Sequence, residues 1–520
     1  MRVSTSQIHQ AAVKSLLDQQ AALSRTQQQV ASGQRILVPS DDPAAAAEVL
    51  GLDQSTRITA QYQENITAAR QRLNLEESTL GSITNLLVRV RELAVQGANS
   101  TLTNVDRTAI GVEVQQNLNE LFDLANTRDA SGEYLFAGMQ SRVQPYTVDA
   151  AGNYSYNGDA GQRFIQIGAT RQVASNDAGS EVFQGARAGN GVFTVAPHPA
   201  NTGTGIIDPG SVTDSAAYDG DTYTLSFPVA TPATSALVFN DAVGTDDNLT
   251  YSLDINGTTV YSVSEAGAPV ASLDALASVI NDDSAVTGVR ALVVDGGLYL
   301  LNTTPGAGPI TVTERMSGAS DGDGDTLTGY FGSSLSGASR PSATLTFQEG
   351  AADFYVVEDS AGNVEASGPY GENSAIRFNG ITTSLHGQPN TGDVFTIAPS
   401  SRRDVFSMVK DLADTLLGGV SGDSDKAAYS NAINRFLADI DQAMEQINAV
   451  RARVGARLNA VDSQESLNEA FKLHLEEARS RLQDLDYASA ITRLNQQMVG
   501  LEAAQKSFLR IQGLSLFNFL

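Results

Sequence analysis

Cysteine and tryptophan are absent from the 520-residue chain. Without cysteine, the chain cannot form a disulfide framework, a cysteine zinc site or a thiolate nucleophile. Histidine is scarce, and none of the histidines has a second histidine or a close acidic pair at ligand spacing. The four are His9, His198, His386 and His474. We therefore expect no metal site and no cofactor.

Motifs that bind nucleotides or carry nucleophilic catalysis are also missing. The chain has no phosphate loop, no dinucleotide fingerprint and no nucleophile elbow. Asp321, Asp323 and Asp325 resemble the start of a calcium loop, but Thr326 stands where the sharp turn of that loop needs glycine. We interpret these residues as an acidic surface turn and predict that the protein is not an enzyme.

Long hydrophobic runs and positive charge are in short supply. No stretch of about 20 apolar residues is present to span a membrane, and the start, MRVSTSQIHQAAVKSLL, lacks the apolar segment of a signal peptide. Residues 185–400 contain 24 Asp and Glu against 5 Arg and no Lys. Because such a surface repels nucleic acids and anionic membranes, we expect neither as a partner and interpret the region as a solvent-facing domain.

Both ends of the chain carry the alternating three- and four-residue spacing of apolar residues that is typical of a coiled-coil seam. The C-terminal stripe begins at Tyr487, and the chain after Gly513 stays uncharged to Leu520. The stripe in residues 1–32 is thinner, since Gln20 and Gln27 occupy two of its positions. Each stripe needs a distant or external partner to cover it. The residues expected in this assembly interface are Val13, Leu16, Leu23, Val30, Ile491, Leu494, Met498, Leu501, Phe508, Leu514, Leu516 and Phe517.

Longer helices are expected inside these two ends. Asp42 followed by Pro43 is typical of a helix start, and the spacing predicts a helix to about residue 96 and a second one over 104–126. Helix returns near Asp404 and keeps a regular spacing to Val461. Beyond that point the pattern predicts a shift of phase, with the seam continued in a new register by Leu467, Phe471, Leu475 and Leu482.

Between about residues 132 and 400 the pattern changes to strands, as aromatic and β-branched residues alternate with Gly, Asn and Asp turns. GNGVFTVAP from Gly189 and TGDVFTIAP from Thr391 echo each other, which indicates that two edges of one β domain come together. The segments LTYSLDINGTTVYSV, SLDALASVINDD and VRALVVDGGLYLLNTT predict a hairpin, a short helix and a second hairpin. We expect these three in an inserted module.

The order of elements predicts an α+β multidomain protein, in which both chain ends form an α-helical coiled-coil rod and the middle forms a mostly β outer domain. The expected domains are 1–42 with 480–520, 43–140 with 401–479, and 141–400 with a small α+β module inserted at about 235–345. Fixing the backbone costs about 1–2 kcal/mol per residue, and a buried Leu or Phe returns roughly 1.5–3 kcal/mol. The terminal helices, poor in large apolar residues, are therefore expected to order on assembly.

Four segments resemble, in the same order, motifs of the flagellin-like axial proteins of the bacterial flagellum. They are MRVSTSQIHQ at the start, ASGQRILVPSDDPAAAAEV from Ala31, GEYLFAGMQSRVQPY from Gly132 and IQGLSLFNFL from Ile511. Within this family, SDDP, YLFAG and GLSLF favour the hook-filament junction proteins over the true flagellins. The resemblance covers residues 1–150 and 400–520 well and the middle only loosely, although 250–305 also looks like a module inserted in some flagellins and filament-cap proteins.

The resemblance implies a structural adaptor that joins the hook to the flagellin filament. It implies a ring of copies of this chain, with a hook-associated junction protein on one side and flagellin on the other. It also implies secretion to the flagellum through the type III export apparatus, with an export chaperone as a partner of the C-terminal helix. Two alternatives stay open: a filament-forming flagellin, and a carbohydrate-binding or enzymatic β domain displayed on a rod.

Overall fold

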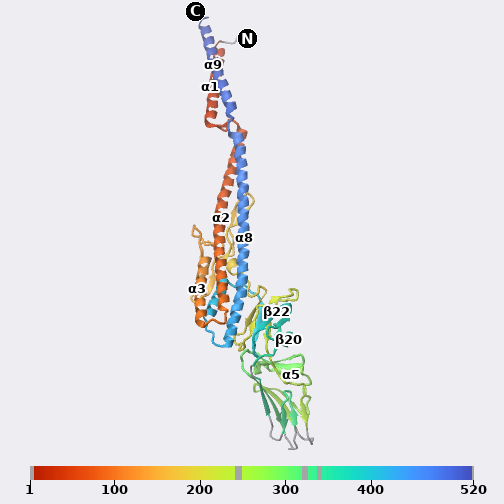
Figure 1. Ribbon diagram of the computed structural model, residues 1–520. Coiled ribbons are helices and arrows are strands. Elements are labelled where there is room, and N and C mark those ends of the chain that lie inside the picture. The colour runs from red at the N-terminus through yellow and green to blue at the C-terminus, as the bar shows by residue number, and fades with distance from the viewer. Residues whose placement is uncertain (1–4, 241–248, 319–325, 337–341, 348–349, 518–520) are drawn as a thin grey trace. The chain divides into compact units, whose positions relative to one another are not determined.

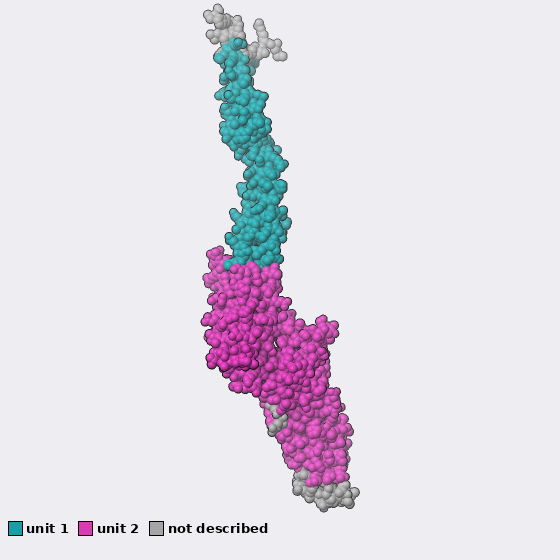
Figure 2. All heavy atoms as spheres, viewed as in Figure 1, with its two compact units in different colours: residues 1–75, 163–175, 454–520 teal, residues 76–162, 176–453 magenta. Residues whose placement is uncertain are grey.

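The computed structural model describes residues 5–240, 249–318, 326–336, 342–347 and 350–517. The chain divides into two compact units, shown in separate colours in Figure 2. Unit 1 comprises residues 1–75, 163–175 and 454–520, and unit 2 comprises residues 76–162 and 176–453. Two long helices, α2 (Pro43–Gly97) and α8 (Asp423–Gln483), contribute to both units.

Unit 1 contains two helix pairs and one hairpin. Helices α1 (Thr5–Ser32) and α9 (Tyr487–Phe517) run side by side in opposite directions (Figure 1). The first part of α2 packs on the last part of α8, where Arg70 forms ion pairs with Asp462 and Glu465. The hairpin of β3 (Phe164–Gln166) and β4 (Gln172–Ala174) lies on this second pair, because Asn65 donates to the carbonyl of Gln166 (2.8 Å).

The shift of phase predicted after Val461 is wrong. Leu467 and Phe471 are exposed, and the seven-residue repeat of α8 continues without interruption. Its buried positions are Ile440, Ile447, Val454, Val461, Asn468 and Leu475. The seam turns polar at Asn468 because the hairpin backbone needs a donor there: the Asn468 side chain donates to the carbonyl of Ile167 (2.9 Å) and accepts from Gln464 (2.8 Å). A pattern of apolar residues cannot reveal such a position.

Unit 2 contains a helical layer built from α3 (Asn104–Ala125), α7 (Val405–Leu417) and the remaining parts of α2 and α8. Thr103 closes a capping box at the start of α3, and Asp404 caps α7. Gly111 allows α7 to approach α3, since a Cβ there would lie 3.0 Å from Leu417. Glu76, which interrupts the apolar spacing of α2, is buried and accepts from the backbone N–H of Asp177 (3.0 Å). The helix bounds predicted from the sequence at residues 43–96, 104–126 and near 404 agree with α2, α3 and the start of α7 within one or two residues.

The β region of unit 2 opens with the hairpin of β1 and β2 and the short helix α4, followed by a five-stranded antiparallel sheet in the order β20-β19-β8-β23-β5. The predicted meeting of the two echo segments is confirmed, because β5 and β23 pair from Phe193↔Pro399 to Pro197↔Phe395. The bounds are β1 Tyr146–Val148, β2 Tyr154–Tyr156, α4 Gly179–Phe183, β5 Phe193–Pro197, β6 Ile206–Ile207, β7 Ser211–Val212, β8 Tyr223–Ser226, β19 Phe354–Glu358, β20 Val364–Pro369, β21 Ala375–Phe378, β22 Ile381–His386 and β23 Val394–Pro399.

A second hydrophobic core, separate from that of the five-stranded sheet, lies between residues 237 and 335. The helix α5 and the two hairpins predicted here are present, and a four-stranded sheet has the order β12-β11-β15-β18. The bounds are β9 Val229–Ala230, β10 Val238–Asn240, β11 Thr250–Ile255, β12 Thr258–Ser264, α5 Leu273–Asp282, α6 Ser284–Thr287, β13 Val289–Val294, β14 Gly297–Asn302, β15 Ile310–Ser317, β16 Thr326–Thr328, β17 Ser334–Ser336 and β18 Ser342–Phe347.

Three expectations drawn from the sequence concern the acidic turn, metal binding and membrane-spanning helices. Asp321, Asp323 and Asp325 lie outside the described residues. Among the residues that are described, no group of three His, Asp or Glu is placed to hold a metal ion. None of the helices in the described ranges combines the length and hydropathy needed to cross a bilayer.

Replacing Asn468 with alanine should destabilise the β3–β4 hairpin, since the buried carbonyl of Ile167 and the Gln464 amide lose their partner. The expected cost is about 2 kcal/mol, or roughly thirtyfold faster hydrogen exchange of the hairpin amides. The matched control, Leu467→Ala, changes an exposed neighbour and should leave exchange almost unaltered. A larger effect of Leu467→Ala than of Asn468→Ala would support the shifted register that was predicted from the sequence.

Candidate assembly interface

The contact between α1 and α9 combines small and polar residues with apolar residues that are only half-buried. On α9 the row formed by Arg493, Gln497 and Gly500 lines the space beside α1, with a spacing of four and three residues. On α1 the most deeply buried residue of this contact is Thr26, which is 3% exposed and bonds back to the carbonyl of Ala22. This inner row is too poor in apolar area to hold the two helices together by itself.

The predicted apolar stripe of α9 lies beside this row and remains partly open to solvent. We call Tyr487, Ile491, Leu494, Met498 and Leu501 the outer stripe. Ile491 is 46% and Met498 50% exposed, whereas Leu494 and Leu501 are half-buried. Phe508, farther along α9, is half-buried as well. The outer stripe therefore offers apolar surface that one copy of the chain does not cover.

The predicted residues of α1 fall into the same class. Leu16, Leu23 and Val30 are half-buried, and Val13 is 41% exposed. The expectation that Gln20 and Gln27 fill the seam is wrong, because both are exposed. Gln19 and Thr26, one residue earlier, lie toward α9 instead. The thin apolar pattern of this segment left its register undetermined by one residue, which rotates a helix by about 100°.

Three further predicted residues lie at the end of α9. The backbone of Leu514, Leu516 and Phe517 continues the helix. Their side chains lie outside the part of the chain that the structure describes.

Two crossing connections, residues 33–42 and 484–486, join the helix pairs of unit 1. We call them the elbow. They pair as a short antiparallel bridge, since the N–H of Arg35 donates to the carbonyl of Gln483 (2.7 Å) and the N–H of Leu485 donates to the carbonyl of Gly33 (2.9 Å). Gly33 has φ +72°, and a Cβ there would lie 2.9 Å from the Tyr487 hydroxyl oxygen. The positive φ of this residue therefore accounts for the glycine of the SGQR segment.

Arg35 fastens the elbow with its side chain. Its Nε and Nη2 donate to the carbonyl of Leu482 (3.1 and 2.8 Å), at the C-terminal end of α8, and its Nη1 donates to Asp42 (3.2 Å). Asp42 in turn caps α2 by accepting from the N–H of Ala45 (3.1 Å). One guanidinium thus ties the end of α8 to the start of α2.

A second ion pair holds the loop on α1. Asp41 accepts from the N–H groups of Leu37 (3.0 Å) and Val38 (3.2 Å) and forms an ion pair with Arg25 of α1. The two aspartates of the SDDP segment therefore have different tasks, since Asp41 shapes the loop and Asp42 caps a helix.

The bonds at Asp42 also act on its titration. The N–H of Ala45, and after it the guanidinium of Arg35, stabilise the carboxylate and hold the pKa of Asp42 below its ordinary value of 3.8. The elbow is therefore fully bonded above that value and loses its Asp42 contacts as the pH falls through the lowered pKa.

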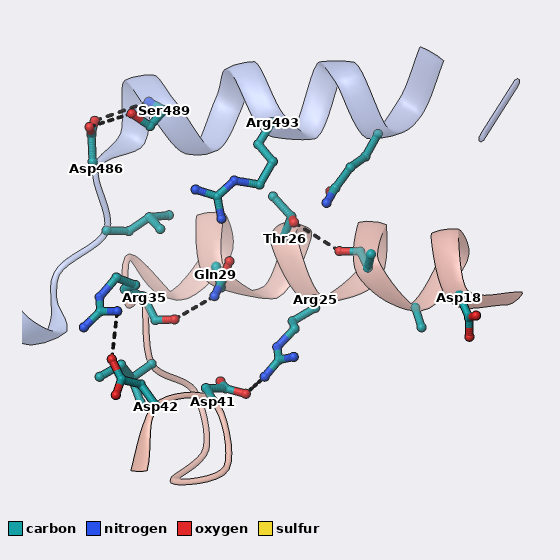
Figure 3. Close-up of a pocket in the computed structure, with 15 residues that line it drawn as sticks. Asp18, Arg25, Thr26, Gln29, Arg35, Asp41, Asp42, Asp486, Ser489 and Arg493 are labelled. Carbon is teal, nitrogen blue, oxygen red and sulfur yellow. Dashed lines mark hydrogen bonds and ion pairs between the residues drawn. The ribbon is translucent and has the colours of Figure 1, made fainter. Parts of the chain in front are cut away.

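A cleft of about 730 Å³ lies between α1, α9 and the elbow (Figure 3). Arg493 reaches into it from α9, and Asp18 lies toward the other end of the lining part of α1. Asp486, which caps α9 by accepting from Ala488 and Ser489, closes the elbow side. Sequence reasoning missed the role of Arg35, because that role depends on the carbonyl of Leu482, far away along the chain. It also missed Arg493 and Gln497, because polar residues on a helical face carry no apolar signal. Only the spacing of Ala490, Arg493, Gln497 and Gly500 could have pointed to them.

Comparison with known proteins gives two family matches. A model of the bacterial flagellin N-terminal helical region matches residues 3–141, and one of the bacterial flagellin C-terminal helical region matches residues 437–520. Flagellar hook-associated protein 3 of Escherichia coli K12 is 32% identical over 183 residues, which are 35% of this chain and 57% of the relative. The chain thus spans little more than half the length of that relative.

Two crystal structures from Legionella pneumophila are similar over most of the chain. One is of flagellar hook-associated protein-3, with 28% identity, a TM-score of 0.56 and a match covering 83% of this chain and 98% of that one. The other is of a flagellar junction protein, with 26% identity, a TM-score of 0.55 and coverage of 84% and 100%. Helices at both ends and a mostly β middle are common to them and this chain.

Replacing Arg35 with alanine should loosen the elbow, because three bonds of its guanidinium are lost. Discounted for solvent exposure, the loss is about 1 kcal/mol. Hydrogen exchange of the Leu485 N–H should then be roughly fivefold faster. Arg493→Ala removes an arginine of the same cleft that takes part in none of these bonds, so hydrogen exchange of the Leu485 N–H should not change. Equal acceleration in both variants would contradict the role given to Arg35.

The titration of Asp42 separates its two main causes. In Arg35→Ala the pKa of Asp42 should rise part of the way to its ordinary value of 3.8, because the larger contribution, from the Ala45 N–H, remains. NMR titration of the Asp42 carboxyl carbon measures both midpoints. A full return to the ordinary value would mean that Arg35, and not the helix start, dominates.

Proposed function

Because the chain belongs to the flagellin-like family of bacterial flagellar proteins, we propose that it is a structural junction protein that joins the hook to the flagellin filament. The observation that carries this proposal is the outer stripe of α9, whose apolar residues remain partly exposed beside the contact with α1. A protein whose function is assembly needs such a surface, and a catalytic function does not.

The energetics favour order that is completed by neighbours. Burying the open half of an Ile- or Met-sized side chain is worth roughly 1 kcal/mol, while fixing each backbone residue costs about 1–2 kcal/mol. A lone α1–α9 pair therefore gains little from folding, and each neighbour that covers an outer stripe adds to the stability of both copies. The terminal helices become fully ordered on assembly, with the twelve predicted residues from Val13 to Phe517 in the contacts.

The partners follow from the family and from the printed names of the relatives. The relatives are a hook-associated protein and a junction protein of the flagellum. We assign to this chain a homo-oligomeric ring, a neighbouring hook-associated protein on one side, flagellin on the other and an export chaperone for the C-terminal helix. Its location is the extracellular flagellum, reached through the type III export apparatus.

The domain division predicted from the sequence is part of the proposal. The elbow at 33–42 and 484–486 supports a boundary between the terminal domain, 1–42 with 480–520, and a coiled-coil rod domain, 43–140 with 401–479. The separate core between residues 237 and 335 supports an inserted α+β module at about 235–345 within the outer domain 141–400.

A filament-forming flagellin is the second candidate, because both family models that match the chain describe flagellin helical regions. Purified protein distinguishes the two. A flagellin should form long homopolymers when seeded, whereas a junction protein should form short assemblies or none. The described residues give no specific support to a carbohydrate-binding or enzymatic outer domain.

Charge placed on the outer stripe should prevent assembly without unfolding the monomer. In Ile491→Asp and Met498→Asp the substituted positions are about half exposed, so the free energy of unfolding should change by only about 0.5 kcal/mol. A deletion strain carrying either variant should export the protein yet grow no filament. Thr492→Asp, on the opposite face of α9, should restore filaments. Normal filaments with the stripe variants would refute the proposal.

A further inference from the structure

Acidic residues are rare on the terminal helices. Residues 5–32 contain only Asp18, and residues 487–517 contain only Glu502. Glu502 is already paired with Lys506 one turn along α9 (2.5 Å). Asp18 is exposed, and among the described residues it forms no ion pair, not even with Lys14 one turn before it. The terminal pair therefore presents one uncommitted carboxylate.

The cleft beside it contains an uncommitted cation. Arg25 is occupied by Asp41, and Arg35 is occupied by Asp42 and the carbonyl of Leu482. Arg493 extends into the open space between the helices (Figure 3), and no ion pair is seen for it in the described ranges. Beside it the Oε1 atom of Gln497 is buried, with no donor among the described residues. A donor and an acceptor thus stand open in one cleft.

Asp18 and Arg493 line the same cleft but do not pair within one copy. The antiparallel register places Gly33 beside Tyr487, and Gln19 and Ala22 beside Gln497 and Gly500. By this register Arg493 lies opposite residue 26, eight residues from Asp18. Eight residues of helix correspond to about 12 Å along the axis, so the two side chains start far apart, and no ion pair joins them in the described residues.

We propose that the cleft receives α1 of a second copy of this chain, and that Asp18 of that copy pairs with Arg493 of this one. The inference rests on the proposed assembly function and names the charges that set the register between copies. Two different patches of one chain that complement each other make a heterologous contact, the kind that closes into rings. An Arg–carboxylate pair adds directional bonds that apolar contacts lack. The incoming helix is also rich in amide side chains, and these can donate to Gln497.

Cysteine cross-linking tests this in the full-length protein, which has no cysteine of its own. Asp18→Cys and Arg493→Cys are made as separate variants and expressed together in a deletion strain, and isolated hook-filament structures are oxidised. A disulfide-linked dimer should form at least tenfold more in the mixture than with either variant alone. Met139→Cys, an exposed position of unit 2, replaces either partner as the control and should give no dimer with it.

Each outcome either supports or overturns the proposed pairing of Asp18 with Arg493. Completed filaments that contain both variants without a dimer would overturn the pairing, as would a disulfide that forms only inside a chain carrying both cysteines. If the cysteine variants fail to assemble, a charge exchange replaces them: Asp18→Arg and Arg493→Asp should each reduce filament number at least tenfold, and the double variant should recover it. No recovery would overturn the pairing. Wild-type protein that never locates to the junction would refute the proposed function itself.

Discussion

The structure of the chain ends depends on one constraint, which is that the contact between α1 and α9 includes small and polar residues and leaves its larger apolar residues half open. Thr26, Arg493 and Gln497 contribute little apolar area to this contact. The outer stripe, with Ile491 and Met498 about half exposed, is then only partly covered within one chain. Under the proposed function neighbours complete this cover, so that assembly and ordering are a single event.

The elbow gives that event a defined geometry. Both connections cross between Gly33 and Asp486, and Arg35 binds the end of α8 and the start of α2 at once. The two connections are hydrogen-bonded to each other. The chain segments that lead from the second helix pair to the terminal pair are therefore held side by side. The short SGQR and SDDP segments hold the two connections together through hydrogen bonds.

Periodicity predicted the long helices, the paired echo strands and the hairpins, because apolar spacing and turn residues are local signals. It failed where polar groups replace apolar ones inside a contact. Asn468 keeps the seven-residue repeat of α8 but is invisible to a hydrophobic pattern, so the seam was moved to Leu467 and Phe471. The seam of α1 was likewise predicted at Gln20 and Gln27, one residue after Gln19 and Thr26, which lie toward α9. Arg35 belongs to a segment that carries the family resemblance, yet its role depends on Leu482, 447 residues away along the chain.

Oxidation of Met498 tests the central claim most directly. Met498 is 50% exposed in the single chain and Met139, in unit 2, is 65% exposed. Peroxide converts accessible methionine to the sulfoxide. Mass spectrometry of monomer and of assembled flagella gives the rate at each site. If neighbours cover the outer stripe, Met498 should react at least tenfold more slowly after assembly, whatever the change at Met139. An unchanged rate at Met498 would contradict the account.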